Sequence, residues 1–174
     1  HRDQFRCMNI QCVAYSTPLT IKTEVNPITP GIEPASTAAR SARFDQAFVR
    51  ISLIPDLGGT WFLPHTVGDA RARALAMLGT SVPAEEAARM GMVWQVVDAA
   101  TLMEEAGKIA KKLATGPTRS YAAIKGAINA AATNTLDQQL DLERDRQREL
   151  GKSEDFKEGV AAFLAKRAPN FTGR

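Results

Sequence analysis

The second half of the chain is a series of amphipathic segments separated by residues that stop or start helices, and this pattern limits the possible folds most strongly. Within residues 99–174 the breaks fall at Gly116-Pro117, before Thr135 and at Ser153. Gly-Pro ends one helix and allows the next, because proline is tolerated in a first helical turn. Thr135 followed by Gln138 fits a capping box, and Ser153 can cap a further helix. The pattern predicts four closing helices.

The apolar positions of these segments recur at helical spacing, so we expect each to form one buried face. The members of these faces are Leu102, Ala106, Ile109 and Leu113; Tyr121, Ile124 and Ile128; and Phe156, Val160 and Phe163. The helix after Thr135 is different, because arginines at 144, 146 and 148 alternate with acidic residues. That alternation is typical of a solvated helix face with i,i+3 ion pairs.

Composition argues against several classes of function. The formal charge is +3, but from Phe44 onward 17 Lys/Arg stand against 16 Asp/Glu, which is no nucleic-acid footprint. No apolar run approaches the roughly 18–20 residues of a membrane-spanning helix, and no signal-peptide pattern opens the sequence. Cys7 and Cys12 have only His1 and His65 as further soft ligands, so we expect free thiols and no metal. We expect a cytoplasmic protein that binds neither nucleic acid nor membrane.

The first 37 residues differ in character from the rest. Prolines at positions 18, 27, 30 and 34, together with many Thr and Ser residues, interrupt any sustained helical or strand period. Such composition is typical of loops. We therefore place a boundary near residue 38 and expect an atypical, loop-like or poorly structured segment over residues 1–37.

The stretch from Phe44 to the strand-like Val93–Val97 contains shorter elements. Phe44–Ile54 is rich in Phe, Val and Ile and predicts a short extended segment before Pro55. Asp69 can cap a helix that stops at Gly79. Val93-Trp-Gln-Val-Val97 predicts a strand. We expect short helices and strands in this part of the chain.

One segment, Ile54-Pro-Asp-Leu-Gly-Gly-Thr-Trp61, could carry chemistry. Motifs of nucleotide-binding loops, serine hydrolases and zinc proteases are absent from the sequence. Asp56 stands between an apolar segment and a diglycine whose backbone N–H groups could face a ligand at a helix N-terminus. Apolar surroundings disfavour an ionised carboxylate, which suits it to proton transfer. The residues themselves leave two readings open, an acid/base or a simple Pro-Asp turn or helix cap.

Four motifs in order resemble the enoyl-CoA hydratase/isomerase (crotonase) family. They are Ser41-Ala-Arg-Phe44, Ile54-Pro-Asp-Leu-Gly-Gly-Thr-Trp61, Gly91-Met-Val-Trp-Gln-Val-Val-Asp98 and Ala162-Phe-Leu-Ala-Lys-Arg167. The resemblance implies an α/β fold that is mostly α in this chain. Residues 38–98 would be the C-terminal part of a crotonase-like β/α spiral, and residues 99–174 a helical trimerisation module that also covers the active site.

Within the family, the residue choices resemble isomerases that act on ring epoxides of phenylacetyl-CoA. Hydratases carry a glutamate where Phe48 stands, and phenylalanine cannot transfer a proton, whereas isomerases place an aspartate at the position of Asp56. The implied function is acyl-CoA isomerisation, in which an epoxide or double bond shifts within a phenylacetyl-type thioester. The thioester carbonyl is polarised toward an enolate while Asp56 shuttles a proton.

The resemblance also implies residues that contact the acyl group. Phe48 and Leu53 would line an apolar wall, although both could equally be ordinary core residues. Gly58 and Gly59 would allow the backbone to approach the substrate. For Trp61, burial in the core is the more natural expectation.

Coenzyme A is expected as the carrier in the substrate thioester, with no prosthetic group. Phe163 and Lys166 resemble family residues that hold its adenine and a phosphate, usually in a neighbouring subunit's site, although Lys166 could also be a solvated surface lysine. The closing helices would assemble the protein into a homotrimer or a dimer of trimers.

The sequence also departs from the family pattern. Residues 1–37 lack the Gly-Gly-Gly loop and strand end that supply two oxyanion-binding N–H groups in the family, so we expect a truncated copy. His65 replaces a common arginine and Ser52 replaces a glycine. Two alternatives to an isomerase therefore stay open: a non-catalytic assembly module that lacks the oxyanion hole, and an enoyl-CoA hydratase, against which Phe48 argues.

Overall fold

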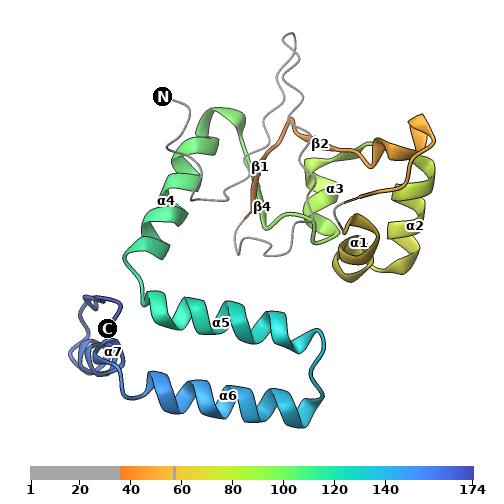
Figure 1. The fold of residues 1–174 in the computed structure, drawn as a ribbon. Coiled ribbons are helices and arrows are strands. Elements are labelled where there is room, and N and C mark those ends of the chain that lie inside the picture. Colours follow the sequence, from red (N-terminus) through yellow and green to blue (C-terminus); the bar gives the residue numbers. More distant parts are fainter. Residues whose placement is uncertain (1–35, 57) are drawn as a thin grey trace, which may run out of the picture. The chain divides into compact units, whose positions relative to one another are not determined.

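A computed structural model describes residues 36–56 and 58–174 of the protein (Figure 1). The chain divides into two compact units, His1–Gly107 and Lys108–Arg174, which are described separately. The boundary falls within one helix. The expectations for residues 1–35 lie outside the described residues.

The first unit combines short strands with short helices. In chain order they are β1 (Thr37–Ala39), β2 (Arg43–Phe44), the 3-10 helix η1 (Ala47–Ile51), α1 (Gly59–Val67), α2 (Asp69–Leu78), β3 (Val82–Pro83), α3 (Ala84–Arg89), β4 (Gln95–Val97), η2 (Ala99–Thr101) and the start of α4 (Leu102–Ala114). β1 pairs in parallel with β4, Ala38 facing Val96, and β2 pairs antiparallel with β3. Each pairing joins segments far apart in the sequence, and Figure 1 shows β1 and β4 side by side.

Small apolar side chains form the core of this unit. Leu63 of α1 is its largest fully buried side chain, and Ala84 and Ala87 bring α3 close to its neighbours. The other buried members are Ala38, Ala42, Phe44, Val67, Ala72, Leu75, Val82, Met92 and Val93. Because the alanines are so small, helices and strands approach closely here.

The extended segment predicted for Phe44–Ile54 is wrong beyond β2. Residues Ala47–Ile51 form η1, which ends at Ser52 in the left-handed conformation (φ 60°). Arg50 explains the difference, because its guanidinium donates to the Gly79 carbonyl at 2.5 Å and pairs with Asp45 at 3.2 Å. These tertiary contacts outweigh the strand preference of Phe, Val and Ile.

Of the two helix boundaries predicted for this unit, one is confirmed and the other is wrong. α2 ends at Gly79, whose φ is 59°. Asp69, however, is the first residue of α2 and not its cap. Its carboxylate hydrogen-bonds Arg73 (2.8 Å), which lowers the pKa of Asp69.

The second unit contains the end of α4 and three further helices. α5 (Thr118–Ala131) and α6 (Leu136–Leu150) form a hairpin, and α7 (Glu154–Leu164) follows after a short turn (Figure 1). The four predicted closing helices are confirmed. So is the capping box of α6, in which Thr135 accepts from the Gln138 N–H and Gln138 accepts from the Thr135 N–H.

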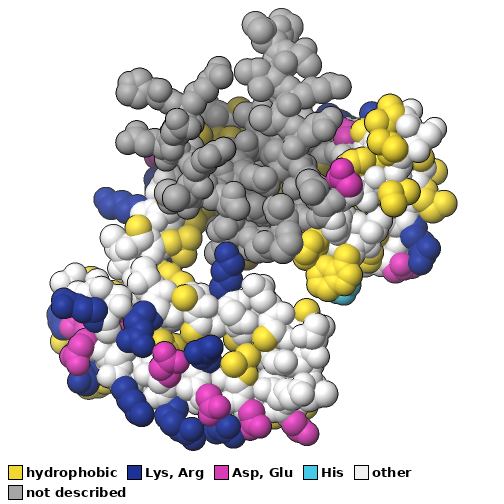
Figure 2. Space-filling view, in the orientation of Figure 1, with side chains coloured by type: hydrophobic (Ala, Val, Ile, Leu, Met, Phe, Trp, Pro, Cys, Tyr) yellow, Lys and Arg dark blue, Asp and Glu magenta, His cyan; other side chains and the backbone are white. Residues whose placement is uncertain are grey.

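The solvated face predicted for α6 is confirmed. Arg144 pairs with Asp141, Arg148 with Asp145, and Arg146 with Glu149. Figure 2 shows basic and acidic side chains alternating along this surface. Exposed pairs of this kind contribute little to stability.

The buried faces predicted for α5 and α7 are wrong within this unit. Ile124 and Ile128 of α5 are 53% and 67% exposed, and Phe163 of α7 is 83% exposed. Phe156 and Val160 are exposed as well. The apolar positions recur at helical spacing as predicted, but within this unit no other element buries these side chains.

Candidate active site

The segment around Asp56 is held by η1. The backbone N–H of Leu53 donates to the carbonyl of Phe48 (3.0 Å), and that of Ser52 donates to the carbonyl of Val49 (3.1 Å). These bonds close the end of η1 and turn the chain toward Pro55. Phe48 is half-buried, whereas Leu53 is 58% exposed.

The backbone conformation of Ser52 explains why the family pattern favours glycine at this position. Its φ of 60° lies in the left-handed region, which glycine adopts without steric cost. The replacement is visible in the sequence, but its conformational reason appears only in the structure.

A tight turn then leads from Asp56 into α1. The Gly59 N–H donates to the Asp56 carbonyl at 2.7 Å, and the N–H groups of Trp61 and Phe62 donate to the Gly58 carbonyl at 2.9 Å. Gly58, with φ 84°, is the N-cap of α1. Because the Gly59 N–H is used inside this turn, it is not free in this arrangement to bind a substrate oxygen.

Both glycines are required by close contacts. A Cβ on Gly58 would lie 2.8 Å from Cε2 of Phe62, and one on Gly59 would lie 3.0 Å from Cβ of Pro55. Real Cβ atoms essentially never show a contact as short as that at Gly58, whereas at Gly59 Pro55 would have to move by a few tenths of an ångström. The diglycine therefore sets the angle at which the chain enters α1.

Asp56 itself is exposed to solvent in the described chain, and so is Ile54, at 77%. The described residues therefore do not provide the desolvated surroundings that the sequence suggested for this carboxylate. They do fix its backbone, through the turn to Gly59. Phe48, Leu53 and Asp56 thus precede residue 57, which the structure does not describe, and Gly58 and Gly59 follow it.

Aromatic side chains of α1 lie just beyond the turn. The Trp61 ring stacks on His65, with centroids 4.3 Å apart and planes 25° apart, and meets Phe62 edge-on at 4.7 Å. The Nδ1–H of His65 donates to the Trp61 carbonyl at 2.6 Å. Trp61 is 49% exposed, so its expected burial in the core is wrong within this chain.

The two residues expected to contact coenzyme A lie in the second unit. Phe163 is in the last turn of α7, and Lys166 lies just after the C-cap of this helix, with φ 52°. Both are exposed. Their role in binding stays a prediction.

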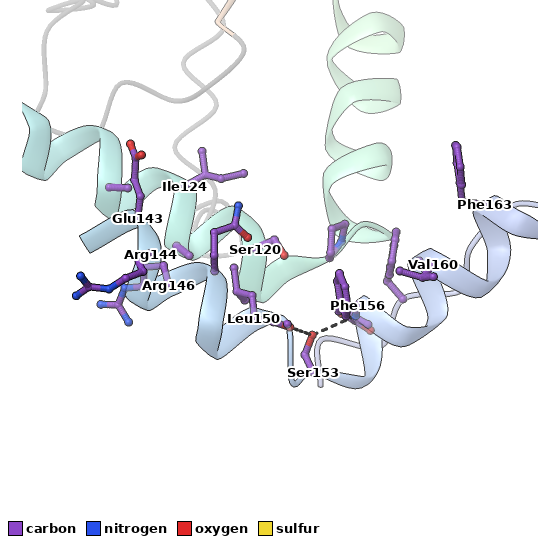
Figure 3. A pocket seen from close by; sticks show the side chains of 18 of the residues that line it. Ser120, Ile124, Glu143, Arg144, Arg146, Leu150, Ser153, Phe156, Val160 and Phe163 are labelled. Atoms are coloured by element: carbon purple, nitrogen blue, oxygen red, sulfur yellow. Dashed lines mark hydrogen bonds between the residues drawn. The ribbon is translucent and has the colours of Figure 1, made fainter. Parts of the chain in front are cut away.

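A groove on the second unit was not foreseen from the sequence. It has a volume of about 770 Å³ and is lined by α5, α6 and α7. Figure 3 shows Phe156, Val160 and Phe163 along its α7 side, with Ile124 and Leu150 opposite. In the sequence, the signal for this groove is the helical spacing of its apolar residues, which predicted buried faces and not an exposed groove.

Among residues 36–56 and 58–174, no group of three or more His, Cys, Asp or Glu side chains is gathered as metal ligands. None of the helices in this part of the chain is long and apolar enough to cross a membrane.

The short strand pairs, the Pro-Asp-Leu-Gly-Gly turn before α1 and the following helical unit define a class: the C-terminal part of a crotonase-type α/β fold. The family model described as enoyl-CoA hydratase/isomerase matches residues 35–174. The chain therefore belongs to this family.

Two curated relatives show the range of reactions named in the family. The chain is 59% identical over 137 residues to the 1,2-epoxyphenylacetyl-CoA isomerase of Escherichia coli K12, a match that covers 79% of this chain and 52% of the relative. It is 47% identical over 167 residues to a probable enoyl-CoA hydratase of Rhodobacter capsulatus, covering 92% and 65%. The second match covers more of the chain than residues 35–174 alone can supply, so it extends into the earlier residues.

Solved structures agree with the fold. An enoyl-CoA hydratase from Polaromonas superposes with a TM-score of 0.76 at 35% identity, covering 80% of this chain and 54% of that one. An enoyl-CoA hydratase from Bacillus anthracis gives 0.77 at 32% identity, covering 81% and 55%. The chain thus spans between half and two thirds of the length of these relatives.

Proposed function

We propose that the chain is the part of an acyl-CoA isomerase that carries the acid/base, Asp56. The reaction would shift an epoxide or a double bond within a phenylacetyl-type CoA thioester. One observation carries the proposal: a diglycine turn fixes the backbone of Asp56. The family resemblance adds that Phe48, which cannot transfer protons, stands where a hydratase is expected to carry glutamate. The high identity to an enzyme named as such an isomerase supports the same substrate class.

In this mechanism Asp56 acts on the acyl chain and the thioester carbonyl takes up charge. The Asp56 carboxylate removes a proton from the acyl chain, and the electron pair moves toward the carbonyl oxygen to form an enolate. The protonated carboxyl then returns the proton at the other reacting position, so the isomerisation needs no co-reactant. Backbone N–H groups that stabilise the enolate oxygen would come from outside the described residues.

Coenzyme A would enter only as part of the substrate, and no prosthetic group is required. Phe163 offers an exposed aromatic ring on which an adenine can stack, and Lys166 offers an ammonium for a phosphate. In the assembled enzyme these residues would serve the site of a neighbouring subunit. We place the reaction in the cytoplasm, where acyl-CoA thioesters are available.

A chimera tests the role of Asp56. Joining the N-terminal part of the Escherichia coli isomerase to residues 38–174 would supply the part of that relative that this chain does not match. We expect isomerase turnover in the chimera, and a loss of about 10²–10⁴-fold in Asp56→Asn, since the amide keeps the shape but cannot accept the proton.

The control for this experiment is Asp69→Asn, which changes an exposed aspartate of the first unit that pairs with Arg73. It should leave turnover unchanged. Normal turnover in Asp56→Asn would refute the acid/base assignment. Addition of water to crotonyl-CoA by the unmodified chimera would favour the hydratase alternative.

The groove of the second unit favours a second candidate function, a non-catalytic assembly module. Its apolar side chains are exposed in the single chain, and a homotrimer or dimer of trimers formed through the closing helices would cover them. Sedimentation of the purified chain tests this proposal, with Val160→Asp as the disrupting variant and Lys157→Glu, on the charged surface, as the control. A monomer at all concentrations would exclude self-assembly.

A further inference from the structure

After α7 the chain turns back along the same helix. We call residues 167–174 the return segment. The carboxylate of Asp155, a residue only 6% exposed, accepts hydrogen bonds from the backbone N–H groups of Thr172 (2.7 Å) and Gly173 (2.9 Å). The Asp155 N–H donates to the Arg174 carbonyl at 2.9 Å. Because a buried carboxylate needs hydrogen-bond partners, Asp155 is committed to holding the return segment.

Glu158, one helical turn later, holds the beginning of the return segment. Its carboxylate accepts from both terminal nitrogens of Arg167, at 2.6 and 2.8 Å, and from the Asn170 N–H at 2.7 Å. The Arg167 side chain first, and then the Asn170 N–H, lower the pKa of Glu158 to about 2. The Phe171 ring of the return segment lies beside Gly159. A Cβ on Gly159 would be 3.6 Å from Cε1 of Phe171.

Lys166 lies between the end of α7 and the return segment, in the left-handed conformation. Its N–H donates to the Phe163 carbonyl (3.2 Å), and the Arg167 N–H donates to the Ala162 carbonyl (3.0 Å). Together these are the two bonds of a Schellman motif, in which glycine is usual at the position of Lys166. A side chain in this conformation persists only where the surroundings hold it. Here the neighbouring residue, Arg167, is held by Glu158.

We propose that Glu158 and Arg167 are positioning residues that keep Lys166 left-handed, so that its side chain leaves the end of α7 in one direction and can bind a phosphate monoester of coenzyme A. The identity of the ligand in this inference rests on the proposed function, whereas the left-handed conformation of Lys166 rests on the structure alone. Among the described residues the Lys166 ammonium forms no ion pair, whereas Arg167 and Lys157 each pair with a carboxylate. A fixed starting direction reduces the conformational freedom that a lysine loses on binding.

Nuclear magnetic resonance of the 174-residue chain tests the conformational part. The variant is Glu158→Gln, and the matched control is Glu154→Gln, which removes the same charge from the same helix where Glu154 pairs with Lys157 at 2.7 Å. A strong intraresidue HN–Hα NOE and the carbon shifts of Lys166 should report a positive φ in the native chain and the control. In Glu158→Gln they should move toward the values of an averaged backbone, while far-ultraviolet circular dichroism shows that helix content is kept.

Calorimetric titration tests the ligand part, with coenzyme A and with dephospho-coenzyme A, which lacks the phosphate monoester. We expect Lys166→Ala and Glu158→Gln each to weaken binding of coenzyme A roughly 5- to 20-fold, the loss of one charge-assisted contact. Binding of dephospho-coenzyme A should not change. General damage to the unit would weaken both ligands alike.

The two parts fail separately. A positive φ at Lys166 that survives Glu158→Gln would overturn the positioning role, whatever the ligands do. If φ relaxes as expected but the native chain does not distinguish the two ligands, the phosphate assignment and the proposed role of Lys166 in coenzyme A binding are wrong. The conformational role of Glu158 would then stand alone.

Discussion

Replacing Gly58 by alanine should destabilise the first unit strongly for a change of one methyl group. Gly58 has φ 84°, and a side chain in the left-handed region costs about 1–2 kcal/mol. The added Cβ would also lie 2.8 and 3.0 Å from Cε2 and Cδ2 of Phe62. Forcing the ring to move costs about 1–3 kcal/mol, as overpacking generally does. Alanine restricts the unfolded chain and offsets about 0.4–1 kcal/mol. We expect a net loss of about 2–3 kcal/mol.

Urea unfolding followed by tryptophan fluorescence measures this loss in the right unit. The only two tryptophans, Trp61 and Trp94, both lie in the first unit, so excitation above the tyrosine band reports on that unit alone. In a Phe62→Leu background the ring atoms are absent, and Gly58→Ala should then cost only the left-handed penalty less the same unfolded-chain offset, about 1 kcal/mol.

Two results would contradict this reasoning. A loss below about 0.5 kcal/mol would mean that Gly58 does not hold its left-handed conformation. An equal loss with Phe62 and with leucine at that position would mean that the ring does not press on Gly58. Isomerase turnover of the chimera, measured in parallel, should fall in Gly58→Ala, because the same turn places Asp56.

Three further predictions concern other parts of the chain. Ser52→Gly should stabilise the first unit by about 0.5–1 kcal/mol by removing a left-handed side chain, and Ser52→Ala should not; equal stabilities in urea would refute this. Thr135→Ala removes the cap that accepts from the Gln138 N–H at 3.3 Å, and should cost about 1 kcal/mol, visible as faster amide exchange in the first turn of α6. Arg167 lowers the pKa of Glu158 from 4.5 to about 2. The contribution of Glu158 to holding the return segment should therefore be fully present above pH 4.5 and be lost as pH falls through about 2. Exchange of the Asn170 amide follows that loss, and Glu158→Gln should show no such transition.

Local signals in the sequence predicted much of the helical structure. Thr135 and Gln138 cap each other across three residues, Ser153 accepts from the Phe156 N–H, and Gly79 ends α2. Each of these depends on residues within one helical turn, so the sequence contains the whole interaction. Short-range chemistry of this kind can be read without a structure.

Other features depend on distant residues and could not be predicted. Arg50 stabilises η1 by reaching Gly79, 29 residues away. Asp155 holds Thr172 and Gly173 across 17 and 18 residues, and nothing periodic marks those partners. Periodicity identified the apolar positions of α5 and α7 correctly, but it does not state whether the cover comes from the same unit.

At the candidate site, the local reasons for choosing the predicted residues were incomplete, and their catalytic and binding roles stay predictions. The diglycine was expected to free backbone N–H groups, but one of them closes the turn at Asp56. The role of Phe48 and Asp56 in chemistry came from resemblance, and the described surroundings leave that carboxylate exposed. Desolvation depends on what lies over the site, which a local motif does not encode.

The exposed groove between α5, α6 and α7 also links the folded fraction of this protein to the concentration of whatever binds the groove. Any copy or partner that binds the groove stabilises only the folded form, so the folded fraction rises with the amount of that partner. A chain that is made in excess of its partner keeps apolar side chains such as Ile124 and Phe163 uncovered, which is the kind of surface that chaperones and proteases engage. Cells would then retain the chain in proportion to its partner and degrade the surplus.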